Sequence, residues 1–117
     1  MFTLRIRPPQ LAALADLSRR RLVISAVAHL RDEHPDRWAD SPDPAVTPWA
    51  ERRLARGQEL GLVEEAALLR HLEVASRLGE KFADSPDAVG VLHDHGALQD
   101  WPATWEFLTR LHQAAVA

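Results

Sequence analysis

The chain of 117 residues contains no cysteine, no tyrosine and only one lysine. The absence of cysteine excludes disulfide bonds, thiolate zinc sites and a cysteine nucleophile, and it is compatible with a reducing compartment. The set of general acids and bases is short, because tyrosine is missing and lysine occurs once. The sequence therefore offers little material for catalysis.

Motifs that carry catalytic chemistry are also missing. The five glycines are isolated from one another, so no glycine-rich loop is present to cradle a phosphate. The adjacent carboxylates of Glu64 and Glu65 stand at the start of a predicted helix, where the helix dipole explains them without catalysis. We therefore predict a protein that is not an enzyme and needs no cofactor. None of the serines stands in a G-x-S-x-G context: Ser18, Ser25, Ser41, Ser76 and Ser85.

Long apolar runs and an excess of positive charge are lacking too. No stretch approaches the ~20 apolar residues of a membrane span, and the N-terminal FTLRIRPP lacks the apolar core of a signal peptide. The net charge is −3, and the one basic run, Arg19-Arg20-Arg21, is most simply a solvated helix face. Nucleic-acid binding favours a basic surface. We therefore expect a cytoplasmic protein that binds neither nucleic acid nor membranes.

One segment, Leu60–Phe82, carries a clear helical stripe of apolar residues. Leu68, Leu72, Ala75 and Gly79 stand at positions i, i+4, i+7 and i+11, so they share one face of a helix. Such a face is stable only when other helices cover it, and the chain has the length of one domain. We therefore predict an all-α fold, a single domain over 1–117 built as an irregular bundle of four to five helices.

The positions of proline and glycine predict where the remaining helices and loops begin and end. Residues 1–7 alternate apolar and polar side chains, which predicts an extended N-terminal arm whose apolar side lies on the helices. The apolar residues of the first helix drift around its axis, so a bend or a change of packing partner is expected at 18–21. Thr47-Pro48 is expected to begin the second helix, and Gly61 and Gly79 to follow the second and third. The expected helices cover 10–33, 48–60, 64–78, 86–93 and 100–115, with loops at 36–46 and 94–99.

Two clusters contain histidines at spacings that are compared with those of metal sites. His93 and His95 point the same way in an extended segment and would share a metal ion, but no third ligand with recognisable spacing is nearby. A polar loop at the end of a helix is the other interpretation. His29 and Glu33 are out of register by one residue with the metalloprotease motifs, so an exposed ion pair between them is expected instead.

His71 lies on the apolar face of the third helix. A histidine in that position is more typical of a core residue with a backbone hydrogen-bond partner than of a catalytic base. We therefore expect His71 to be structural.

Four tryptophans are more than a helical core of this size needs. Trp101 and Trp105 share one face of the last helix, while Phe107 and Leu111 share another, and a small monomer buries only one of them. Trp38 stands in a predicted loop. Tryptophan is a preferred residue at protein interfaces, so Trp38, Trp101 and Trp105 are candidate partner-binding residues. Packing of the second face on the N-terminal arm is the alternative.

The chain resembles a known family in three segments that follow one another in order: VAHLRDEHPDR at 27–37, ARGQELGLVEEA at 55–66 and RLGEKFADSPDAVGVLHD at 77–94. The resemblance covers nearly the full length of the chain, and the family consists of small all-helical bacterial proteins of uncharacterised domain type. The genes of that family lie beside type VI secretion spike, PAAR and effector genes. The chain departs from the family at His71, where the family has an apolar or aromatic residue, and at Ala88-Val89, where it has a tryptophan.

This resemblance implies a cytoplasmic accessory protein that acts by binding, as a chaperone or adaptor for a type VI secretion effector or spike protein. The family has no catalytic motif to transfer. Two alternatives remain open. One is an immunity protein that binds and inhibits a cognate toxin, and the other is a small metal-dependent enzyme that uses His93 and His95.

Overall fold

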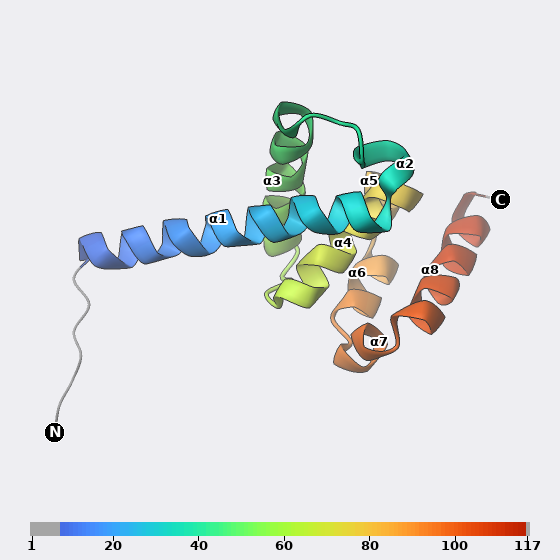
Figure 1. Ribbon diagram of the computed structural model, residues 1–117. Coiled ribbons are helices and arrows are strands. Elements are labelled where there is room, and N and C mark those ends of the chain that lie inside the picture. The colour runs from blue at the N-terminus through green and yellow to red at the C-terminus, as the bar shows by residue number, and fades with distance from the viewer. Residues whose placement is uncertain (1–7, 117) are drawn as a thin grey trace, which may run out of the picture.

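The computed structural model describes residues 8–116, and within that range the chain forms eight α-helices and no strand (Figure 1). The predicted all-α bundle is confirmed. The five expected helices correspond to the five longer ones, and three helices of four or five residues lie in the connections between them. The predicted N-terminal arm lies outside the described residues. The helices are α1 (Pro8–Glu33), α2 (Pro35–Trp38), α3 (Asp43–Glu59), α4 (Glu65–Leu78), α5 (Glu80–Ala83), α6 (Pro86–Leu92), α7 (His95–Gln99) and α8 (Trp101–Val116).

Helix α4 is the centre of the fold, as its apolar stripe predicts. It contacts α1, α3, α5 and α6, and Leu68, Leu72 and Ala75 are buried. The two glycines that follow α3 and α4 have positive φ angles, 92° for Gly61 and 101° for Gly79. Glycine adopts this conformation without the steric cost that other residues meet, which explains why both helices stop where predicted.

Helix α3 begins a full turn earlier than Thr47-Pro48 predicts. Its first residue is Asp43, and Pro48 lies inside it. The earlier start places Val46, which is fully buried, on the same inner face as Trp49 and Ala50. Burial of that extra turn outweighs the one backbone hydrogen bond that Pro48 cannot donate.

The predicted loops hold short helices. Helix α2 falls in the predicted loop at 36–46, and α7 in the loop at 94–99, where the Asp94 carboxylate accepts hydrogen bonds from the backbone N–H groups of Gly96 and Ala97. Ser85 caps α6, because its Oγ accepts a hydrogen bond from the N–H of Ala88 at 3.3 Å. Helix α8 is tied to α7 by the hydroxyl of Thr104, which donates to the carbonyl oxygen of Ala97 at 2.6 Å.

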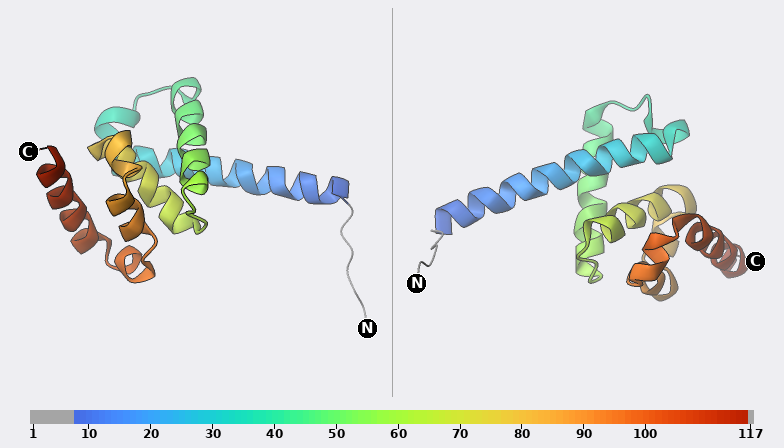
Figure 2. Two further views of the ribbon diagram at one scale, coloured as in Figure 1. Left: turned by 180° about the vertical axis from the view of Figure 1, so that it is seen from behind. Right: turned by 60° about the horizontal axis from the view of Figure 1, so that its bottom comes forward.

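Helix α1 is one unbroken helix of 26 residues, about 39 Å long at 1.5 Å per residue. Only its C-terminal half packs on the domain, through Ala26 and Leu30, while its N-terminal half projects away from the other helices (Figure 2). Every side chain from Ala15 to Arg21 is exposed. The projection explains a radius of gyration of 16.2 Å, against about 13 Å for a compact chain of this length.

The apolar residues of α1 drift around its axis because they belong to two opposite faces of the helix. The face that carries Ala26 and Leu30 is buried in the domain, and the opposite face carries Leu17 and Ile24, whose side chains are 50% and 69% exposed. The expected bend or change of packing partner at 18–21 is not what the drift reflects: the helix is unbroken, and the side chains from Ala15 to Arg21 are exposed and have no packing partner among the described residues. Over the described range, no helix is both long enough and apolar enough to cross a membrane.

Candidate functional site

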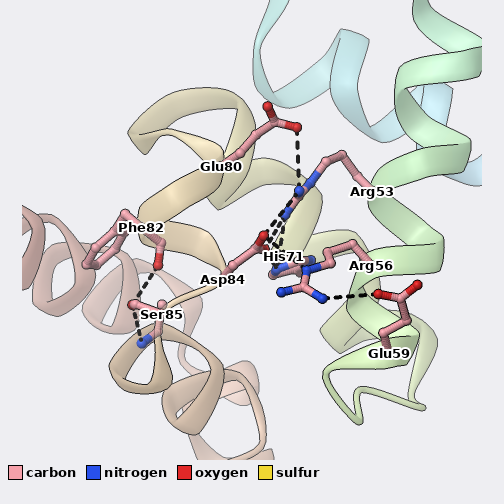
Figure 3. A network of polar contacts seen from close by, with 9 residues as sticks. Arg53, Arg56, Glu59, His71, Glu80, Phe82, Asp84 and Ser85 are labelled. Atoms are coloured by element: carbon pink, nitrogen blue, oxygen red, sulfur yellow. Dashed lines mark hydrogen bonds and ion pairs between the residues drawn. The ribbon is translucent and has the colours of Figure 1, made fainter.

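The densest cluster of ionisable groups lies where α3, α4 and α5 meet (Figure 3). His71 of α4 is completely buried, and its Nε2 lies 3.1 Å from Oδ1 of Asp84, the residue that follows α5. Arg53 of α3, only 6% exposed, forms an ion pair with the same carboxylate. Arg56 also donates from Nε to Oδ2 of Asp84 at 3.3 Å. One carboxylate therefore joins three helices.

The protonation states in this cluster follow from burial and from Arg53. Burial lowers the pKa of His71, the charge of Arg53 lowers it further, and Asp84 only partly opposes them. Burial alone would raise the pKa of Asp84, but hydrogen bonds from Arg53 and Arg56 lower it overall. The cluster thus consists of an ionised carboxylate, two guanidinium groups and a neutral imidazole.

A neutral His71 that donates from Nε2 to Asp84 leaves Nδ1 as a bare acceptor, and Nδ1 has no hydrogen-bond partner among the described residues. Helix α3 covers it at Gly57. A Cβ at that position would lie 3.2 Å from Nδ1 and 2.8 Å from Cδ2 of Leu68. The imidazole is therefore enclosed by protein atoms.

A histidine with a lowered pKa beside a carboxylate is typical of a general base. No substrate reaches His71 in this structure, because its side chain has no exposed surface. The prediction that His71 belongs to the core is confirmed, and its Nε2 has the side chain of Asp84 as a partner. Sequence reasoning missed Arg53, although it falls between Ala50 and Gly57 on the inner face of α3.

A second polar tie joins the end of α1 and helix α2 to α4. The hydroxyl oxygen of Ser76 accepts a hydrogen bond from Nε1 of Trp38 at 2.7 Å and lies 2.6 Å from Nδ1 of His34. Burial, followed by the charges of Arg77 and Arg37, lowers the pKa of His34, so Ser76 donates its proton to a neutral ring. Both hydrogen-bonding functions of Ser76 are used, which makes this serine–histidine pair a structural contact.

The tryptophans are held in place by arginines. The guanidinium of Arg37 lies 4.4 Å from the ring centroid of Trp38. On the other side of the domain, Arg70 and Arg77 of α4 lie 4.6 Å and 4.9 Å from the ring centroids of Trp101 and Trp105 of α8. Such stacking contributes about 0.5–1 kcal/mol at exposed sites and more where water is excluded.

Two of the three candidate partner-binding residues belong to the core: Trp38 and Trp101 are 5% and 8% exposed. The reason is that α2 and α8 pack on α4, which the sequence pattern does not reveal. The role of these two tryptophans in partner binding stays a prediction. Trp105 is partly buried against the core, and its role in partner binding stays a prediction as well.

His93 and His95 lie on either side of a helix boundary and not in one extended segment. His93 ends α6, and His95 is the first residue of α7. The ring nitrogens of His95 lie 3.5 Å from a carboxylate oxygen of Glu64 and 3.1 Å from Nε2 of Gln99. Between residues 8 and 116 no three His, Asp or Glu side chains are placed to hold a metal ion.

His29 was expected to pair with Glu33 along α1, but it pairs across helices. Its Nε2 lies 3.5 Å from the carboxylate of Glu73 on α4, whose second partner is Arg70 at 2.9 Å. Glu33 is 4.0 Å from that same guanidinium. The face of α1 that carries His29 packs on α4, so the partner comes from the neighbouring helix.

Two grooves open on the surface. The larger, about 880 Å³, lies in the corner between α1 and α3. We call it the α1–α3 groove, and its lining includes Arg19, Leu22, Val23, Glu51, Leu54 and Ala55. The smaller, about 580 Å³, lies between α6 and α8. We call it the α6–α8 groove, and its lining includes Asp87, Val91, Asp94, Asp100, Ala103 and Phe107.

No protein-family model matches the chain, and neither the curated proteins nor the solved structures give a match. The function is therefore argued from the surface and from the residues of this chain.

Proposed function

We propose that this protein acts by binding another protein, as an adaptor or chaperone for a type VI secretion effector or spike protein. The observation that carries the proposal is the α1–α3 groove, which the projecting half of α1 forms with α3. The resemblance of the three sequence segments to proteins encoded beside type VI secretion genes supplies the class of partner.

The α1–α3 groove has the properties of a site for a helix. Leu22 and Val23 of α1 and Leu54 of α3 are apolar side chains that line it, and all three are at least partly buried. A helix about 10 Å in diameter that lies in this corner would contact α1 and α3 together. Recognition of an amphipathic helix by an apolar groove is a common mode of protein binding.

A partner bound in the α1–α3 groove would also stabilise the projecting half of α1. The side chains from Ala15 to Arg21 are exposed, so the rest of the domain does not cover them. Helices of fewer than about 12–15 residues are marginal in water unless other elements pack on them. A partner in the α1–α3 groove would supply that packing, so binding and ordering of α1 would be linked.

Co-expression with type VI secretion effector and spike proteins, first of all any that are encoded beside its gene, tests this function. Ala55→Arg places a long charged side chain in the groove at an exposed position of α3, where Glu51 and Glu59, one turn away on either side, preserve the helix. Ala115→Arg, at an exposed position in the last turn of α8, is the matched control. We expect Ala55→Arg to abolish co-purification and Ala115→Arg to retain it.

Two results would contradict the proposal. If none of these proteins co-purifies with the wild-type chain, the proposed function is wrong. If Ala55→Arg keeps its partner, the α1–α3 groove is not the binding site. Toxin assays then separate an adaptor, which leaves effector activity intact, from an immunity protein, which abolishes that activity at a stoichiometric ratio.

A further inference from the structure

The outer face of α1 combines apolar and basic side chains. Leu17 and Ile24 are seven residues apart and share this face, and both are at least half exposed. Arg20 and Arg21 are three or four residues from each of them, so the two guanidinium groups flank the apolar pair on its two sides. Neither arginine forms an ion pair with another described residue. We call these four residues the α1 ridge.

The α6–α8 groove has the opposite charge. Its apolar lining includes Val91 and Phe107, whose side chain is 52% exposed. All of its ionisable side chains are acidic: Asp87 on α6, Asp94 before α7 and Asp100 before α8. All three are exposed, and none of them forms an ion pair within residues 8–116.

We propose that the α1 ridge of one copy of this protein binds in the α6–α8 groove of a second copy. Leu17 and Ile24 meet the apolar lining of the groove, and Arg20 and Arg21 meet its aspartates. The α1 ridge lies on the face of α1 opposite to Ala26 and Leu30, which pack on the domain, and helices α6 and α8 lie on the far side of α4 from α1 (Figures 1 and 2). One chain therefore cannot close the contact within itself.

The proposed contact is heterologous, because it joins two different surfaces. A pair of copies still has one free α1 ridge and one free α6–α8 groove, so the assembly adds copies head to tail until a ring closes or a filament forms. Charge complementarity contributes to the contact, and salt screens charges over about 8 Å at physiological ionic strength. Association is therefore strongest at low salt.

The contact is independent of the adaptor function but touches the same helix. Arg20 and Ile24 also border the α1–α3 groove, so a partner bound there would compete with head-to-tail association. Ala55→Arg, by contrast, lies on α3 and outside the α1 ridge. It should remove the partner and leave self-association unchanged, which makes failures of the two proposals distinguishable.

Sedimentation of the full chain with two charge-reversed variants tests the proposal. Arg20→Glu/Arg21→Glu disables the α1 ridge, and Asp87→Lys/Asp100→Lys disables the α6–α8 groove. At low salt we expect the average mass of the wild-type chain to rise with concentration to at least twice its 13.1 kDa, and each variant to remain a monomer. An equimolar mixture of the two variants should form a complex, because one keeps an intact groove and the other an intact ridge.

Arg52→Glu/Arg110→Glu is the matched control for Arg20→Glu/Arg21→Glu, since it changes net charge by the same amount and in the same direction at exposed positions outside both surfaces. It should associate like the wild-type chain, and circular dichroism checks that every variant is folded. A wild-type chain that stays monomeric at high concentration and low salt would overturn the proposal. Association that survives either reversal, or a mixture that forms no complex, would overturn it as well. A symmetric contact between two α1 helices predicts that Asp87→Lys/Asp100→Lys still self-associates, because its α1 ridge is intact.

Discussion

The carboxylate of Asp84 makes a strong prediction about stability. Asp84→Asn keeps the size of the side chain but removes the charge that balances Arg53, which is almost fully buried. Removal of one partner of a buried ion pair typically costs about 3–5 kcal/mol. Glu80 remains 3.4 Å from Arg53 but is largely exposed, and Asp84 itself is partly exposed, so both reduce the cost. We expect a loss of about 2–3 kcal/mol.

A loss of that size lowers the melting temperature by about 10 °C, because unfolding a chain of this length has an entropy of about 0.25 kcal/mol/K. Thermal or urea unfolding followed by circular dichroism measures it. Asp87→Asn is the matched control: it changes an exposed carboxylate without an ion pair, and such substitutions cost within about 0.5 kcal/mol. If Asp84→Asn costs no more than Asp87→Asn, Arg53 does not depend on this partner.

A double-mutant cycle separates the ion pair from other effects of the substitution. Arg53→Met removes the buried charge and keeps an apolar stem of similar length. In the Arg53→Met variant, Asp84→Asn no longer leaves a buried guanidinium without its partner. The double variant should therefore be more stable than the sum of the single changes by about 1.5 kcal/mol or more. Simple additivity would refute the coupling.

Three further predictions concern the same core. Burial and Arg53 lower the pKa of His71 in the folded chain, so as the pH falls His71 takes up a proton in the unfolded chain before it does so in the folded chain. The contribution of His71 to the free energy of unfolding is therefore complete above about pH 6.5 and falls as the pH drops below it. Urea unfolding measured against pH should show a smaller loss of stability in acid for His71→Leu than for the wild-type chain. Gly57→Ala should cost about 1–3 kcal/mol in urea unfolding, because the new methyl group contacts Leu68 and His71. Trp38→Phe removes the hydrogen bond to Ser76 and should lower unfolding free energy by about 1–2 kcal/mol, whereas an unchanged value would mean that water replaces the indole N–H.

The spacing of apolar residues and the positions of proline and glycine were sufficient to predict much of the fold. The apolar stripe of α4 is strict, and the glycines after α3 and α4 have the positive φ angles that stop a helix. The start of α3 was predicted wrongly because Thr47-Pro48 is a good local start. The buried Val46 decides the start instead, and its burial depends on packing with other helices.

The polar contacts of the core were not predictable from spacing. Arg53 and Asp84 are 31 residues apart, and their pairing depends on how α5 turns back after Gly79 to lie beside α3. The burial of Trp38 and Trp101 was not predictable for a related reason. A tryptophan with an arginine over its ring is buried by a residue from another helix, as Trp101 is by Arg70, and no pattern in the local sequence indicates that partner.

The arginine–tryptophan contacts between α4 and α8 have a consequence for the order in which the domain comes apart. Arginine keeps its charge at every pH at which the protein folds, so the contacts of Arg70 and Arg77 with Trp101 and Trp105 do not weaken in acid. The junction of α3, α4 and α5 does weaken, because His71 gains a proton there and Asp84 later loses its charge. We therefore expect acid to loosen the α3 side of α4 before it loosens the arginine–tryptophan contacts between α4 and α8.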